Sequence, residues 1–314
     1  MRRLFIPAMT VLLCITGAGL ASAAVAPIIH RPGAAALHAS TPAPDSPSLQ
    51  PSAPWMSQRG TPPSAPASAD VDQAAVVERL KQATQAVLPG AQVGYEVFDR
   101  TTGSVLASGN AGQQVASMSV VKLLIALDVL ARSNWALPDA GTQQQLHEML
   151  TNSDDEIANE LWTAGGGPAI VIRMASLLGL TGTAPPNDPG EWGNTQITPQ
   201  DMVTVYRYIT DQLPKYNQDL ILGALSDAPK VAADGFDQYF GIPDGMPKYS
   251  WAVKQGWGTS GSQAVMDSTG LVGPQWRYVV VVLSTAPANS YATLPAVVTA
   301  AAGALANLVG SAAS

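Results

Sequence analysis

One lysine of this chain lies in an apolar segment, where a charged side chain is unexpected unless it has a chemical role. Lys122 lies within the otherwise apolar run 120–127. A buried ammonium group is costly unless a neighbour pairs with it or uses it. Ser119 precedes it by three residues, and on a helix this spacing places both side chains on one face, about 5–6 Å apart at Cβ. A neutral lysine beside a serine can take the hydroxyl proton and create a nucleophile.

Two polar stretches later in the chain could complete such a site. Ser153-Asp154-Asp155 opens a predicted helix, and Ser153 with Glu156 also fits an ordinary capping box. Lys254-Gln255-Gly256 lies near the end of a predicted strand, where Lys254 could equally be an edge lysine. Each stretch therefore has a purely structural alternative, as does the first serine–lysine pair. The presence of all three stretches in one chain favours an active site over three separate structural roles.

The elements that must position these stretches predict an α/β (α+β) domain. A helix and a hairpin come first, helices follow, and three strands and a last helix end the chain. We expect an antiparallel sheet assembled from both ends of the chain and flanked by helices, with an inserted all-helical subdomain at about residues 113–214. The predicted helices are 71–87, 119–132, 142–152, 153–162, 168–178, one that begins at Thr198-Pro199, and 294–309; the strands are 91–98, 104–108, 249–257, 263–268 and 276–284.

The N-terminal residues are typical of an export signal. Arg2-Arg3 precede an apolar stretch that ends in Ala21-Ser22-Ala23, so we expect residues 1–23 to be a cleaved signal peptide. An uncleaved membrane anchor is the alternative, because the apolar stretch is about long enough to span a bilayer. A lipidated Cys14 is a second alternative, although this cysteine lies in the middle of the apolar stretch. Any of the three would place the protein outside the cytoplasm, either secreted or in the cell envelope.

Composition separates a linker from a globular domain. Residues 24–69 are rich in Pro, Ala and Ser and predict a disordered spacer, whereas residues 70–314 can bury a substantial core. The formal net charge is −7 and no basic stripe is present, so we expect no nucleic-acid partner. No His, Cys or Asp cluster has metal-ligand spacing, so no metal and no cofactor is expected. The oligomeric state stays open.

The three polar stretches, in this order, resemble the Ser-x-x-Lys, Ser-Asp-Asn and Lys-Thr-Gly motifs of the serine β-lactamase and penicillin-binding protein superfamily. The resemblance covers roughly residues 71–312 and is closest to the class A β-lactamases. The Ala- and Pro-rich exported form is also similar to actinobacterial envelope lipoproteins. The resemblance implies that Ser119 is the acylated nucleophile and Lys122 its base or proton relay. Ser153 would pass a proton toward the leaving nitrogen.

The resemblance also implies a substrate-binding surface, from which this sequence departs at two positions. Lys254 would attract the substrate carboxylate, and Gly256 belongs to the same substrate-binding surface. The backbone N–H of Trp257 would join that of the nucleophile in an oxyanion hole. Asp155 stands where the family has Asn, and a carboxylate cannot donate the hydrogen bond of an amide. It could instead pair with the lysine of the first motif. Gln255 replaces the family's Thr.

A third departure concerns release of the acyl group. In class A enzymes a glutamate of the Ω-loop activates the water that hydrolyses the acyl-enzyme. Here the corresponding segment, Thr181–Ile197, is short and contains a single glutamate, Glu191. Glu191 lies close to Thr198-Pro199, so its alignment with the family glutamate is doubtful. We therefore expect slow or impaired deacylation.

Three functions remain open at this point. The first is a serine hydrolase that acts on a β-lactam or a peptidoglycan-like amide. The second is a catalytically silent envelope-binding module with the same fold, which the departures at Asp155 and Gln255 would explain. The third is an esterase of the same superfamily.

Overall fold

The computed structural model describes residues 72–310. The predicted signal peptide (residues 1–23), Cys14 and the predicted linker (24–69) lie outside the described residues.

A five-stranded antiparallel sheet in the order β2-β1-β7-β6-β5 forms the centre of the fold. Hydrophobic side chains point to both faces of the long strands, which is why the sheet is covered on both sides. Strands β1 and β2 come from the start of the domain and pair with β7 from its end, as the sequence predicts. The strands are β1 (Gln92–Asp99), β2 (Ser104–Gly109), β5 (Trp251–Ser260), β6 (Gln263–Val272) and β7 (Tyr278–Pro287).

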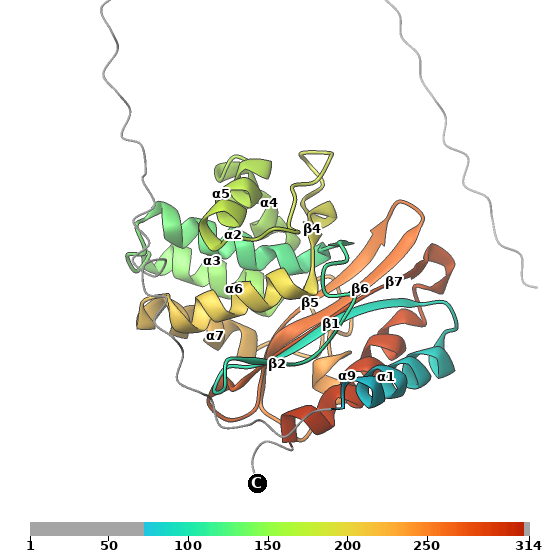
Figure 1. The fold of residues 1–314 in the computed structure, drawn as a ribbon. Helices are drawn as coiled ribbons and strands as arrows, with labels where there is room; N and C mark the ends of the chain where they lie inside the picture. Colours follow the sequence, from blue (N-terminus) through green and yellow to red (C-terminus); the bar gives the residue numbers. More distant parts are fainter. Residues whose placement is uncertain (1–71, 311–314) are drawn as a thin grey trace, which may run out of the picture. The chain divides into compact units, whose positions relative to one another are not determined.

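Helices cover the two faces of the sheet unequally. Helices α1 (Gln73–Val87), α8 (Ile242–Gly245) and α9 (Leu294–Gly310) pack on one face and share a core with Val280 and Val282. The helical block α2–α7 lies on the other face, as Figure 1 shows, and shares its core with Val279 and Val281. The alternation along β7 thus divides two hydrophobic cores.

The helical block follows the predicted order but is longer than expected. Its members are α2 (Lys122–Arg132), α3 (Ala140–Thr151), α4 (Asp155–Ala164), α5 (Pro168–Leu178), α6 (Pro199–Asp211) and α7 (Lys215–Ser226). The sequence analysis did not predict α7, so the helices extend beyond the expected boundary near residue 214. Helix α7 packs on α3 and buries Ile221, Leu222 and Leu225.

A small second sheet ties two loops together near the sheet edge. Strand β3 (Val115–Ala116) pairs with β4 (Gln196–Ile197), and the amide of Ser117 donates to the carbonyl of Thr195 at 2.7 Å. These bonds hold the segment that precedes Ser119 against the loop that carries Glu191 and Trp192.

Candidate active site

Ser119 lies in a tight turn in front of a buried helix. The turn is a 3₁₀ turn, Met118–Val121, and α2 begins only at Lys122. The α-helix expected from Ser119 therefore begins three residues later than predicted, and its first turn is 3₁₀. The expected juxtaposition is nevertheless present, since Lys122 Nζ lies 2.9 Å from Ser119 Oγ.

Ser153 bridges the two buried lysines. Lys122 Nζ donates to the Ser153 carbonyl at 2.7 Å and lies 3.4 Å from its Oγ, while Lys254 Nζ donates to that Oγ at 2.8 Å. Side chains 101 residues apart in sequence thus meet at one hydroxyl. The structure brings together all four polar side chains that the three motifs nominate, namely Ser119, Lys122, Ser153 and Lys254.

The capping-box interpretation of Ser153 was wrong. Asp154 is the N-cap of α4 and accepts from the amide of Ile157 at 3.0 Å. Ser153 has a φ of 55°, in the left-handed region that a serine rarely adopts. Met118, next to the nucleophile, is in the same region. Backbone strain of about 1–3 kcal/mol per residue at both loops is typical of functional sites.

An ion pair sets the charge balance at Lys122. Its Nζ contacts Asp155 Oδ1 at 2.5 Å, while Asp155 itself is largely exposed. Burial lowers the pKa of Lys122 below its ordinary value, and the Asp155 carboxylate opposes that change. The three protons of an ammonium group would be matched by Ser119 Oγ, the Ser153 carbonyl and Asp155. The contact expected for Asp155 is therefore present, and it favours the charged lysine.

Lys254 lies deeper, and no carboxylate of residues 72–310 forms an ion pair with it. It is fully buried in β5, and its other acceptor is the carbonyl of Gln255 at 3.2 Å. Burial, reinforced by the neighbouring charge of Lys122, lowers the pKa of Lys254 well below its usual range. A structural edge lysine would reach solvent, so the edge interpretation was wrong.

Gly256 is required by the close approach of β5 to the nucleophile turn. A Cβ on Gly256 would lie 2.7 Å from the Ser117 carbonyl oxygen and 3.1 Å from Met118 Cβ. Real Cβ contacts are not that short, so any larger residue would displace the turn. Trp257, the next residue of β5, lies at the cavity mouth described below.

Gln255 has a structural explanation. Its amide points away from the cavity and donates to the carbonyls of Gln238 and Phe240 at 3.1 and 2.6 Å. Gln238 in turn donates to the Thr151 carbonyl, and the amide of Ala233 donates to the Asn152 carbonyl. The segment 229–241 therefore connects the Lys254 strand to the residues just before Ser153.

Ser119 opens into a cavity of about 540 Å³. Asp155, Glu191 and Trp257, which the sequence analysis nominated, line it. Sequence reasoning missed the other lining residues, although the Asp234-Gly235 pair could have indicated a turn that carries a carboxylate. The remaining lining residues are Met118, Asn159, Gly190, Trp192, Gly193, Asp234, Gly258, Thr259 and Tyr291.

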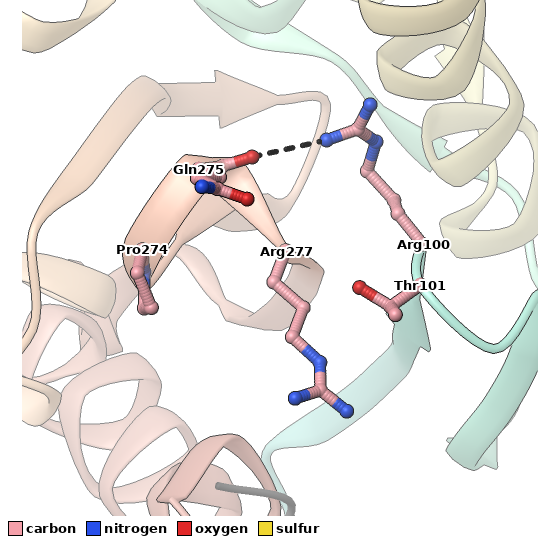
Figure 2. Close-up of a pocket in the computed structure, with 5 residues that line it drawn as sticks. All are labelled: Arg100, Thr101, Pro274, Gln275 and Arg277. Atoms are coloured by element: carbon pink, nitrogen blue, oxygen red, sulfur yellow. Dashed lines mark hydrogen bonds between the residues drawn. The ribbon is translucent and has the colours of Figure 1, made fainter.

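A second cavity of about 540 Å³ lies where β1 ends and β7 begins (Figure 2). Two arginines shape it, but both are engaged within the protein. Arg277 pairs with Asp99 at 2.7 Å, and Arg100 pairs with Asp211 at 2.7 Å and donates to the Gln275 carbonyl. The motif residues lie elsewhere, so this cavity is a poor candidate for the chemistry.

Two further properties concern residues 72–310 alone. Within this range no group of three or more His, Cys, Asp or Glu side chains is arranged to hold a metal ion. No single helix of the range has the length and apolar composition to cross a membrane, although α4 and α5 together meet those criteria as a pair bent by 79°.

A mixed α/β fold with a buried serine–lysine pair on a cavity defines the class of β-lactamase-like serine hydrolase folds. The model of the beta-lactamase enzyme family (Beta-lactamase2) matches residues 140–308, more than half of the chain. This chain belongs to that family. The matched range contains Ser153 and Lys254 but begins after Ser119 and Lys122.

One relative and two solved structures show the extent of the similarity. "Putative lipoprotein LppW" of Mycobacterium tuberculosis is 39% identical over 77% of this chain and 78% of its own length. A β-lactamase from Streptosporangium roseum has a TM-score of 0.61 at 18% identity, over 76% of this chain and 99% of that one. An ancestral class A β-lactamase has a TM-score of 0.57 at 21% identity, over 74% and 99%. At these identities the structures show the fold, and the expected class A-like architecture is confirmed.

Proposed function

We propose that this protein is an exported serine hydrolase that forms an acyl-enzyme at Ser119 with a β-lactam or a peptidoglycan-like amide. The observation that carries the proposal is the 2.9 Å contact between Ser119 Oγ and the buried Lys122 Nζ on a cavity wall. A buried lysine with a lowered pKa is suited to accept a hydroxyl proton.

In this proposal, neutral Lys122 takes the Ser119 proton as Oγ attacks the substrate carbonyl. The Oγ–C bond forms and the C–N bond breaks. The proton reaches the leaving nitrogen through Ser153, whose hydroxyl lies between the two lysines. Lys254 donates a hydrogen bond to the Ser153 hydroxyl and so orients it. The backbone N–H groups of Ser119 and Trp257 donate to the oxyanion.

Release of the acyl group is the weak step of the proposed cycle. Glu191 lines the cavity, but no hydrogen bond of the described residues joins its carboxylate to Ser119 or Lys122. Without a positioned base to activate the attacking water, an acyl-enzyme is hydrolysed slowly, so we infer a long-lived adduct.

A catalytically silent module is the second candidate, and one observation favours it. The Asp155–Lys122 contact at 2.5 Å favours the charged form of the lysine, in which it cannot act as a base. Under this alternative the cavity binds an envelope component without reacting.

Export is part of the proposal and rests on residues 1–23, with a tether at Cys14 or an uncleaved anchor as alternatives. The relative's name as a lipoprotein supports a place in the cell envelope.

Intact-mass analysis of the purified protein with a penicillin tests the proposal. We expect a stoichiometric adduct on the wild type, which persists for minutes or longer, and none on Ser119→Ala. Persistence of the adduct on Ser119→Ala would place the nucleophile elsewhere. A folded wild-type protein that acquires no adduct from penicillins or activated esters would favour the silent module.

A further inference from the structure

The charges around the cavity mouth are all of one sign. Asp155, Glu191 and Asp234 line the cavity and are exposed. Among the described lining residues none is a lysine or an arginine. A cleft lined by charges of one sign concentrates ligands of the opposite sign.

Lys122 offsets Asp155, with which it forms an ion pair at 2.5 Å, whereas Glu191 and Asp234 form no ion pair with any described residue. Lys122 and Lys254 are at most 1% exposed, and their ammonium groups already donate to protein oxygens. An anionic substrate group would have to pass the carboxylates and replace one of these bonds. The acidic rim therefore opposes a carboxylate and favours a cation.

The acidic field is not confined to the rim. Burial raises the pKa of Tyr291, and the charge of Asp234 raises it further. The same charge opposes the lowering of the pKa of Lys122 and of Lys254. Asp234 is held in place because it accepts from Trp257 Nε1 at 2.9 Å. A fixed carboxylate thus stands beside the strand predicted to hold the substrate.

Aromatic rings form part of the same cavity wall. Trp192, Trp257 and Tyr291 line the cavity, and the ring of Trp192 already lies 4.8 Å from an ammonium nitrogen, that of Lys122. Ring faces attract cations, most strongly where water is displaced. Carboxylates interleaved with aromatic rings are suited to an organic ammonium group on an apolar stem.

We propose that the acyl donor of this site carries a positive charge, an amine-bearing acyl chain that Glu191 and Asp234 attract into the cavity beside Ser119. The inference rests on the proposed acylation of Ser119 and specifies its substrate class. In the step, Ser119 Oγ bonds to the acyl carbon as the bond between that carbon and the leaving group breaks, and the leaving group takes up the serine proton. The acyl chain is then covalently attached to Ser119, while its ammonium group keeps its non-covalent contacts with Glu191 and Asp234.

Three thioesters that differ only at the end of the acyl chain provide the test: one ends in an ammonium group, one in a neutral amide and one in a carboxylate. Ser119 acylation releases one thiol per protein, which a thiol reagent and intact mass can follow. We expect the ammonium donor to acylate at least about tenfold faster than the carboxylate donor at low salt, with a smaller ratio at high salt.

Charge variants separate attraction from general damage. Glu191→Gln and Asp234→Asn are each expected to reduce the ammonium-to-carboxylate rate ratio by about three- to tenfold, while the neutral donor changes less. Glu156→Gln removes an equal charge from the next helix position after Asp155, outside the cavity lining, and is expected to leave the ratio unchanged.

The outcomes distinguish this inference from the proposed function. Equal rates for all three donors, or a faster carboxylate donor, would overturn the charge preference while acylation itself stands. No Ser119-dependent thiol release from any donor would overturn the inference, and the additional absence of a penicillin adduct would overturn the proposed function as well.

Discussion

At the scale of single residues, Asp155 decides how readily Lys122 can serve as a base. Its Oδ1 lies 2.5 Å from Lys122 Nζ, and its charge raises the pKa that burial lowers. The neutral fraction of the lysine falls as its pKa rises, so the carboxylate restrains proton transfer from the serine at neutral pH.

Asp155→Asn should therefore increase acylation. Without the carboxylate, burial lowers the pKa of Lys122 further, so the rising limb of the pH–rate profile moves to lower pH. We expect the acylation rate at pH 7 to rise by up to about tenfold, measured by stopped-flow reaction with a chromogenic ester. Glu156→Gln is the control and should leave the profile in place. A lower rate with an unshifted profile would show that Asp155 assists the reaction instead.

Sequence could nominate these residues because each side chain has few alternative uses. Lys122 is conspicuous in an apolar run, and its partner at three residues follows from helical geometry. The left-handed backbone at Ser153 and Met118 could not be predicted, because tertiary contacts impose it against local preference. Asp234 was missed because its position depends on the long-range bonds of segment 229–241.

At the scale of elements, the approach of β5 to the nucleophile turn determines the site geometry. β5 and the turn contact each other at Gly256, where a Cβ would lie 2.7 Å from a backbone oxygen. A flexible side chain could move aside, whereas the Ser117 carbonyl belongs to the turn that carries Ser119.

Gly256→Ala should displace that turn. We expect it to cost about 1–3 kcal/mol in the free energy of unfolding, measured by urea titration, and to reduce acylation by at least about tenfold in protein that remains folded. Gly112→Ala is the matched control, because a Cβ there meets nothing within 4 Å. Equal behaviour of the two variants would mean that the turn accommodates a methyl group.

The same scale shows where element prediction failed. The alternation in β1 and β7 is strong, and both strands were predicted close to their observed bounds. Helix α7 was overlooked because its buried face rests on a few apolar residues among polar ones. Packing against α3 and β5, which joins distant parts of the chain, stabilises the helix.

At the scale of the whole molecule, the burial of Lys254 that the proposed activity requires lowers the stability of the fold. The lysine is buried in β5 without an ion pair to any carboxylate that the structure describes, and its pKa falls well below the usual 10.5. Between the folded and unfolded pKa values the unfolded chain binds more protons. The free energy of unfolding therefore rises with pH across this window.

Lys254→Met should make the protein more stable and inactive. Replacing a buried charge with an apolar chain of similar volume removes a desolvation cost, so we expect a gain of about 1 kcal/mol or more near neutral pH. The gain is greatest below the folded pKa of Lys254 and shrinks as the pH rises toward 10.5, because the lysine becomes neutral in both states only above that value. Thermal unfolding from pH 6 to 10 measures it. Lys248→Met, at an exposed lysine, is the control and should show no such trend. A Lys254→Met variant that is less stable than the wild type at every pH would show that the hydrogen bonds of Lys254 to Ser153 and Gln255 contribute more than its burial costs.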